Sequence, residues 1–378
     1  MRPQGRPLPE PLPPGPVGSG GQLLPRWLRV LPLVLFVVLA VLEPVTPTWA
    51  QLSTLLAALP PLAGLIYGPR RTALLGAGVV LVLVLPKTRA PHISSGDLAA
   101  VTAVAVFSVL VAWVRSRYTR NLVVFRSVAE AAQRAVLPPL PPRVGPVRCA
   151  GLYRPALRAT LVGGDLYDVR AGPFGVRALV GDVRGHGLAA VGTVAAVLGA
   201  FREAVLDEPD LRRVAARLDR RLTVDAAAVG DTELFATALL LELALDDGEV
   251  RMVSLGHPPA LLLRDGGLRE LGVEPAPPLG AAGRTEFRVT ATPLRAGDVV
   301  LGYTDGVIEA RDARGAFYPF TERLAARLAE RGVPAPEELV GSVWRDLVAC
   351  VGVITDDVAL LALRPESTSA DTGGARAA

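Results

Sequence analysis

The sequence predicts an α+β domain that follows an all-helical, hydrophobic N-terminal third. Two observations lead to this prediction. The first is a series of apolar runs confined to residues 26–114, which is typical of helices that cross a membrane. The second is the alternation of short β-like runs with two helical regions over residues 147–364, which favours sheets covered by helices. The change in composition between these segments indicates separate domains.

The N-terminal third contains four apolar runs, which predict spans at about residues 28–45, 51–68, 72–86 and 97–114. The third run is short against the roughly 20 residues that a spanning helix needs. Arginines precede the first run, separate the second from the third and follow the fourth, so the positive-inside rule predicts that both termini are cytoplasmic. We therefore predict a multi-pass protein of the plasma membrane. The alternative is a set of buried helices in a soluble protein.

Three segments surround these domains. Residues 1–25 are rich in Pro and Gly, and residues 365–378 are small and polar, so both are predicted to be disordered. Residues 115–146 predict a helix followed by a Pro-rich linker. The helix is either a coiled-coil seam of about two heptads, which would make a homodimer, or a helix that packs on the next domain. The seam residues are Leu122, Phe125, Ala129, Ala132 and Val136.

Composition excludes several classes of protein. The formal net charge is only +4, and the arginines are not clustered with aromatic residues, so no nucleic acid is expected as a partner. Lys87 is the only lysine, which excludes a P-loop or protein-kinase site in the C-terminal domain because both need a phosphate-facing lysine. Cys149 and Cys350 are too few and too far apart in sequence for a metal-ligand pattern.

Acidic residues recur in turns at the ends of apolar runs in the C-terminal domain. Gly163 and Gly164 precede the first of them and allow positive φ and a close backbone approach. We therefore expect Asp165 and Asp168 to lie in a tight turn and not in a regular strand. Each acidic turn alone has a structural explanation; the Asp-Gly at 305–306, for example, is also a hairpin signal. Together their oxygens favour two divalent cations, Mg²⁺ or Mn²⁺. The residues concerned are Asp165, Asp168, Asp182, Asp305, Asp356 and Asp357.

The same turns belong to longer motifs that resemble those of the SpoIIE/RsbU-type PPM (PP2C-like) serine/threonine phosphatases. The resemblance covers about residues 148–364 and keeps the family's order of motifs. The motifs are GGDLYDV (163–169), GDVRGHGLAA (181–190), FATALL (235–240), LGHPPALLL (255–263), PLGAAG (278–283), LRAGDVVLGYTDGVIEAR (294–311) and DDVALLALR (356–364).

The resemblance implies a PPM-type α-β-β-α sandwich with two Mn²⁺ or Mg²⁺ ions in its central cleft. It assigns Asp182 as the residue that bridges both ions and the Val183 carbonyl as a further ligand. The other carboxylate ligands would be Asp165, Asp305 and Asp356, with Asp357 as a partner of Asp356. Asp168 is expected to orient a ligand or shape its turn.

Three further residues near these motifs have open roles. Arg184 lies inside the metal-binding turn, and we offer the hypothesis that its guanidinium contacts the substrate phosphate. His186 either donates a proton near the cleft or belongs to a structural turn, because glycines flank it. His257, before two prolines, is expected to be a buried structural histidine.

The resemblance implies a membrane-anchored, metal-dependent enzyme that hydrolyses phosphoserine or phosphothreonine on a regulatory protein. The main acidic ligands of the family motif are all present, which argues against a pseudophosphatase. The substrate that the resemblance implies is a STAS-type anti-sigma-factor antagonist. The alternative is a membrane receptor or scaffold whose PPM-like domain binds a partner without catalysis.

Overall fold

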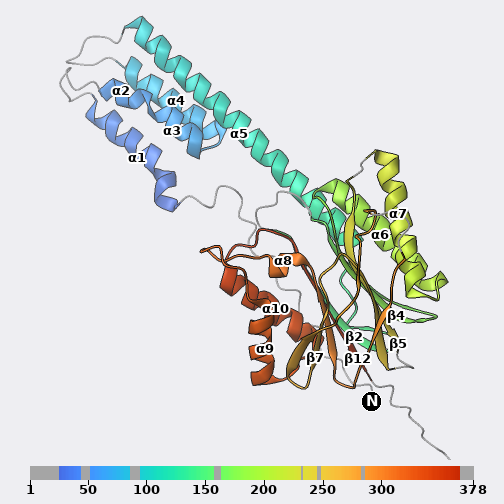
Figure 1. Ribbon diagram of the computed structural model, residues 1–378. Helices are drawn as coiled ribbons and strands as arrows, with labels where there is room; N and C mark the ends of the chain where they lie inside the picture. The colour runs from blue at the N-terminus through green and yellow to red at the C-terminus, as the bar shows by residue number, and fades with distance from the viewer. Residues whose placement is uncertain are drawn as a thin grey trace, which may run out of the picture. The chain divides into compact units, whose positions relative to one another are not determined.

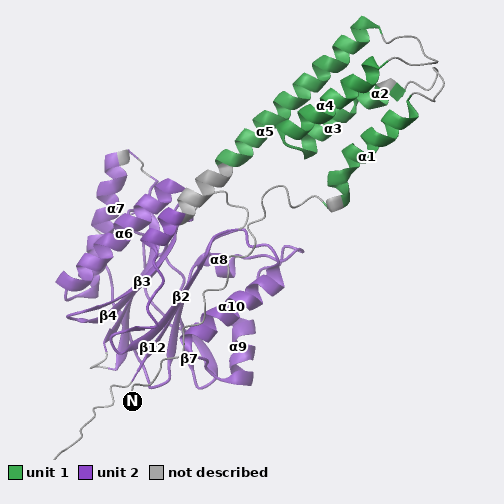
Figure 2. Ribbon diagram, turned by 180° about the vertical axis from the view of Figure 1, so that it is seen from behind, with its two compact units in different colours: residues 1–125 green, residues 126–378 purple. Residues whose placement is uncertain are grey.

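The computed structural model describes residues 25–43, 52–85, 94–156, 163–230, 233–244, 248–281 and 286–366. The chain divides into two compact units, residues 1–125 and residues 126–378, drawn in separate colours in Figure 2. The ends predicted to be disordered, 1–25 and 365–378, lie almost entirely outside the described residues.

The first unit is helical, as predicted. Its helices approach closely where one of two facing residues is small: a Cβ added at Gly76 would lie 3.2 Å from the Cβ of Ala105, and one at Gly78 would lie 2.9 Å from Cζ of Phe36. The second apolar run forms two short helices instead of one, with the break at Ala58. The helices are α1 (Arg26–Leu42), α2 (Leu52–Ala57), α3 (Leu59–Ile66), α4 (Pro69–Val84) and α5 (Ser95–Val136), which continues into the second unit.

Two helices of the described chain are long and apolar enough to cross a membrane, by length and composition alone. They are the first part of α5, Ser95–Asn121, and α6, Leu188–Asp207. Helix α6 packs in the core of the second unit, so it is a core helix of that unit. The other apolar runs form shorter helices, and the four-span arrangement stays a prediction.

Helix α5 joins the predicted fourth span and the predicted linker helix into one helix of 42 residues. Ser94 caps its start, because the Ser94 hydroxyl accepts a hydrogen bond from the Asp97 N–H at 3.1 Å. The last seam residues, Ala132 and Val136, pack against Val191 of α6. This contact is the second of the two alternatives that the sequence allowed, and the homodimer stays a prediction. The Pro-rich linker is also packed on the domain, since Leu137 belongs to its core.

The second unit is a sandwich of two sheets, each with six strands. One sheet, here called sheet A, has the order β1-β2-β12-β11-β7-β8; the other, sheet B, has the order β10-β6-β5-β4-β3, with β9 paired to β6. The strands of sheet A are β1 (Arg143–Val144), β2 (Val147–Arg154), β7 (Leu261–Arg264), β8 (Gly267–Glu270), β11 (Val299–Tyr303) and β12 (Val358–Pro365). Those of sheet B are β3 (Asp165–Gly172), β4 (Gly175–Val183), β5 (Ala236–Ala244), β6 (Glu249–Leu255), β9 (Pro275–Ala276) and β10 (Thr290–Pro293).

Helices cover the outer face of each sheet, which confirms the predicted α-β-β-α order (Figure 1). Helices α6 (Leu188–Asp207) and α7 (Leu211–Val229) pack on sheet B, while α9 (Phe320–Arg331) and α10 (Pro336–Val351) pack on sheet A. One apolar layer lies between each sheet and its helices, and another lies between the two sheets. The layer between the sheets contains side chains such as Val180, Leu241 and Leu361. This middle layer fixes how the ends of the two sheets meet.

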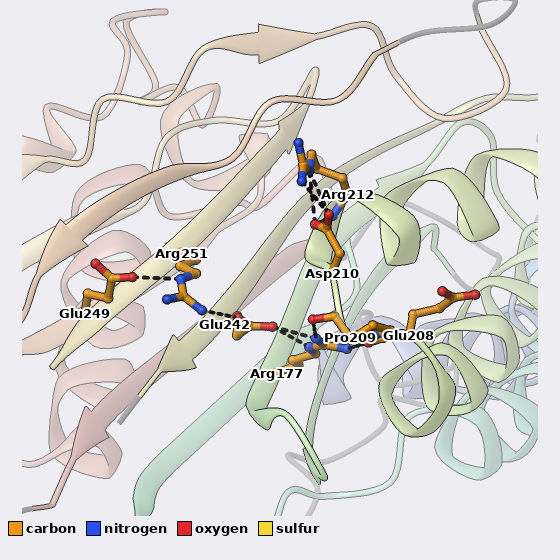
Figure 3. A network of polar contacts seen from close by, with 8 residues as sticks. All are labelled: Arg177, Glu208, Pro209, Asp210, Arg212, Glu242, Glu249 and Arg251. Atoms are coloured by element: carbon orange, nitrogen blue, oxygen red, sulfur yellow. Dashed lines mark hydrogen bonds and ion pairs between the residues drawn. The ribbon is translucent and has the colours of Figure 1, made fainter. Parts of the chain in front are cut away.

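A buried ion pair fastens the corner between α6 and α7 to sheet B (Figure 3). Arg177 of β4 is fully buried, and its Nη2 lies 2.6 Å from Oε2 of Glu242 on β5. The same guanidinium donates to the backbone carbonyls of Glu208 and Pro209. Arg251 approaches Glu242 from the other side at 3.3 Å. The buried charges are therefore paired and hydrogen-bonded, as buried charges must be.

Candidate active site

Sheet B supplies the first half of the site. Asp165 begins β3 and Asp182 lies near the end of β4, and the antiparallel register places the two directly opposite each other. The expectation that Asp165 and Asp168 lie in a tight turn was wrong, since both belong to β3. Directly opposed like charges destabilise a sheet, so this pairing indicates a function that outweighs the repulsion.

The two glycines before Asp165 allow a close approach and not a special backbone conformation. Neither Gly163 nor Gly164 has a positive φ, which corrects one of the two expectations from sequence. A Cβ on Gly164 would lie 2.1 Å from the carbonyl oxygen of Val183 and 2.6 Å from Oδ1 of Asp182. The Val183 N–H donates to the Gly164 carbonyl at 3.1 Å. Gly164 therefore lets this turn lie directly against the candidate ligands on β4.

Sheet A supplies the second half. Strand β11 ends at Tyr303, and Asp305 begins the short helix α8 (Asp305–Ile308) where a hairpin was the alternative. Asp356 and Asp357 directly precede β12. Antiparallel pairing of β11 with β12, and a backbone hydrogen bond from Thr304 to Ala359, bring these segments together.

Thr304 links the two halves. Its hydroxyl donates to Oδ2 of the buried Asp165 at 2.6 Å and accepts from the Ala359 N–H at 2.8 Å. The sheets also touch near this point, because a Cβ on Gly302 would lie 2.9 Å from Cγ1 of Val180. Thr304 was not among the predicted site residues, although its place between an apolar run and Asp305-Gly306 marks it in the sequence.

The carboxylates of the two halves raise one another's pKa. Burial raises the pKa of Asp165 well above its ordinary value, and the neighbouring Asp182 adds to the effect. Burial and then the charges of Asp305 and Asp356 raise the pKa of Asp182. The pKa of Asp305 is raised by burial and by Asp356. Side chains from residues far apart in sequence therefore share one electrostatic environment, which a cation would stabilise.

The donor set suits Mg²⁺ or Mn²⁺, because it consists of carboxylates and one backbone carbonyl. The glycine at 164 leaves space beside Asp182 and the Val183 carbonyl that a side chain would fill. Within the described residues, however, no three His, Cys, Asp or Glu side chains already stand in position around one ion. The chemistry of these residues fits hard cations.

Other predicted residues lie around this cluster. Arg184 forms an ion pair with Glu233 at 2.6 Å, and its guanidinium lies 5.6 Å from the centre of the Phe235 ring. His186 is exposed, in a turn where Gly185 and Gly187 both have positive φ. It makes no hydrogen bond with any residue that the structure describes. The hypotheses for Arg184 and His186 stay predictions.

Asp168 and His257 have structural partners. Asp168 is buried and accepts from Nε of Arg170 at 3.0 Å and from Nε of Arg202 on α6 at 2.6 Å. His257 is also buried, and its Nδ1 lies 3.0 Å from Oγ1 of Thr237, the residue paired with Asp182 on β5. Burial lowers the pKa of His257 to about 4, so its ring is neutral at pH 7. The structural role expected for His257 agrees with these contacts.

The family model described as Stage II sporulation protein E (SpoIIE) matches residues 172–366, just over half of the chain. The chain belongs to the SpoIIE family. This match includes Asp182, Asp305 and Asp356 but begins after Asp165. The SpoIIE-type domain also has the fold of the SiaA-PP2C domain of Pseudomonas aeruginosa, with a TM-score of 0.54 at 20% identity. That likeness covers 66% of this chain and 98% of the Pseudomonas domain, and it shows the PP2C-like α+β fold.

Two curated proteins are related in sequence to the SpoIIE-type region. The chain is 28% identical over 149 residues to the phosphoserine phosphatase RsbP of Bacillus subtilis, covering 39% of this chain and 36% of that protein. It is 26% identical over 147 residues to protein IcfG of Synechocystis sp., covering 38% and 23%. The chain thus spans little more than a third of either relative at most. The shared segment shows that the chain is related to PP2C-type serine/threonine phosphatases.

Proposed function

We propose that this chain is a membrane-anchored, metal-dependent protein phosphatase that hydrolyses phosphoserine or phosphothreonine on a regulatory protein. The observation that supports it most directly is the meeting of Asp165 and Asp182 from one sheet with Asp305 and Asp356 from the other. The proposed substrate is a phosphoprotein of a partner-switching system, such as a STAS-type anti-sigma-factor antagonist.

Some of the proposed site residues would bind the metal ions, and others would orient a ligand or bind the substrate. Asp182 would bridge two Mn²⁺ or Mg²⁺ ions, with Asp165, Asp305, Asp356 and the Val183 carbonyl as the other ligands. When bound, such ions supply a water of lowered pKa and positive charge that shields a phosphate. The Thr304 hydroxyl orients Asp165 through the 2.6 Å hydrogen bond. Arg184 directly follows Val183. We propose that its guanidinium leaves Glu233 and binds the phosphate of the substrate.

A phosphatase assay on residues 126–378 tests this proposal. We expect Mn²⁺-dependent release of phosphate from a phosphoserine protein, and a loss of at least about a hundredfold in Asp182→Asn and Asp305→Asn. Arg212→Gln is a matched control, because Arg212 pairs with Asp210 at the start of α7, away from the carboxylates. Equal activity in wild type and both aspartate variants would refute the proposed phosphatase activity.

The alternative function is a non-catalytic membrane scaffold. A scaffold predicts that the domain binds a phosphoprotein equally well with and without Mn²⁺ and releases no phosphate. The same assay, with a binding measurement in parallel, separates the two functions.

Exposed apolar side chains support the proposed membrane anchor. Leu74 of α4 is 74% exposed and Phe107 of α5 is 65% exposed, on helices with apolar faces. Such surfaces are unfavourable in water and suit lipid. A cytoplasmic reporter fused after Arg120 should be active in cells, and a reporter active only outside the cytoplasm would overturn the proposed orientation.

A further inference from the structure

Asp357 has contacts unlike those of the other carboxylates in the site. Its Oδ1 accepts a hydrogen bond from the backbone N–H of the buried Ala156, just past β2, at 2.9 Å. Its Oδ2 occupies the space beside Gly163, where an added Cβ would lie 1.2 Å away. The Asp357 carboxylate is therefore held between the segment after β2 and the segment before β3. Its Oδ1, which accepts a backbone N–H, has one lone pair fewer to offer a metal ion.

The backbone of Asp357 fills a second gap. A Cβ on Gly306, in the turn after Asp305, would lie 1.8 Å from the carbonyl oxygen of Asp357. Gly163 and Gly306 both have φ outside the positive region, so backbone conformation does not require glycine at either position. Glycine is required at both positions because Asp357 lies too close to leave room for a Cβ. One residue thus explains the glycine in two separate motifs.

Asp356, its neighbour, is placed differently. Its side chain is exposed, and the hydrogen bond that its carboxylate accepts comes from the N–H of Asp357, to Oδ1 at 2.8 Å. Its second oxygen is not hydrogen-bonded to any described residue. The charge of Asp356 raises the pKa of Asp182 and Asp305, and the charge of Asp357 raises that of Asp165 and Asp182, so the difference between the two residues lies in their exposure and hydrogen bonds. Of the two adjacent carboxylates, Asp356 has the freedom that a ligand needs.

We propose that Asp357 is a positioning residue and not a metal ligand. It holds the segment before β3 at Gly163, the start of α8 at Gly306 and the segment after β2 at Ala156 against one another, which sets the distance between the two halves of the site. The role assigned to Asp356 rests on the proposed metal site. The fastening role of Asp357 does not, because its contacts exist within the protein alone.

The fastening role is tested on full-length, metal-free protein in detergent with EDTA, by thermal unfolding. Gly163→Ala should lower Tm by at least about 3 °C, because the new methyl group overlaps Oδ2 of Asp357. Asp357→Ala should also lower Tm, since it leaves the buried Ala156 N–H without its acceptor. The double variant should unfold within about 1 °C of Asp357→Ala, because the overlap is then gone.

Gly164→Ala is the matched control for this cycle. Its methyl group would overlap Val183 and Asp182 and not Asp357, so its effect should add to that of Asp357→Ala. Additive effects of Gly163→Ala and Asp357→Ala would overturn the proposal. If Gly163→Ala does not fold alone, its rescue by Asp357→Ala supports the proposal, and failure of that rescue overturns it.

Titration calorimetry with Mn²⁺ tests the division of roles between the two aspartates. Asp357→Asn keeps an oxygen acceptor for Ala156 and should change Mn²⁺ affinity by less than about threefold. Asp356→Asn should weaken it by at least about tenfold. Equal weakening by both substitutions would overturn the proposal. If wild type binds no Mn²⁺, the proposed metal-dependent function fails, and the metal-free cycle still decides the fastening role.

Discussion

Replacing Arg177 with methionine tests how much the buried ion pair of sheet B stabilises the SpoIIE-type domain. The substitution keeps an unbranched apolar side chain and removes the guanidinium with its charge and its donors. Glu242, only 3% exposed, would then lose the donor at 2.6 Å and keep Arg251 at 3.3 Å. The carbonyls of Glu208 and Pro209 would lose their donors as well.

The expected loss is large because one buried charge is left behind. Breaking a buried pair by removing one partner destabilises a protein by about 3–5 kcal/mol. Arg251 compensates Glu242 in part, whereas the two bare carbonyls add to the loss, so we expect about 3–5 kcal/mol for Arg177→Met. Removing both charges, in Arg177→Met with Glu242→Leu, should recover most of it and end within about 2 kcal/mol of wild type.

Urea unfolding of residues 126–378, followed by circular dichroism, measures these differences. Arg288→Met is the control, because Arg288 and Glu274 form an exposed pair and should contribute little. The reasoning would be refuted if Arg177→Met cost less than about 1 kcal/mol, or if the double variant were as unstable as the single one.

Three further predictions concern the surroundings of the site. The pKa of His257 falls from 6.5 to about 4 on folding, so the unfolded state binds more protons between these values and stability rises with pH across that window, by about 3 kcal/mol in total. His257→Asn should remove this part of the slope in urea unfolding at pH 4.5 and pH 7, and an unchanged slope would contradict it. Thr304→Val should destabilise the metal-free domain by about 1–3 kcal/mol, because Asp165 and the Ala359 N–H lose their partner, whereas Thr304→Ser should not. A fragment that begins at residue 137 should melt below one that begins at 126, because it lacks the contact of Val136 with α6; equal Tm values would rule this out.

The sequence predicted the sandwich well because alternation and helical periodicity are local. The predicted alternation of short strands with two helical regions over residues 147–364 agrees with the strands and helices of the second unit. The two glycines before Asp165 were interpreted as a turn signal, although they are needed for close contacts that only the fold creates.

The candidate ligands could be predicted only through motif resemblance. Spacing alone left each acidic turn with a structural explanation, and nothing local separates Asp168 from Asp165. The fold separates them: Asp168 is paired with Arg170 and Arg202, while Asp165 faces Asp182. Ion pairing with residues distant in sequence depends on tertiary packing, so a sequence pattern does not reveal it.

The division of the site between two sheets also accounts for what holds it together. Strand register fixes Asp165 against Asp182 within sheet B, and β11–β12 pairing fixes Asp305 near Asp356 within sheet A. Neither pairing sets the distance between the halves. That distance depends on the apolar layer between the sheets, on the hydrogen bond from Thr304 to Asp165 and on the close approach of Asp357 to Gly163. Small changes in sheet packing would therefore alter the distance between Asp182 and Asp305 while leaving each half intact, so metal affinity should be more sensitive than fold stability to substitutions in the middle layer.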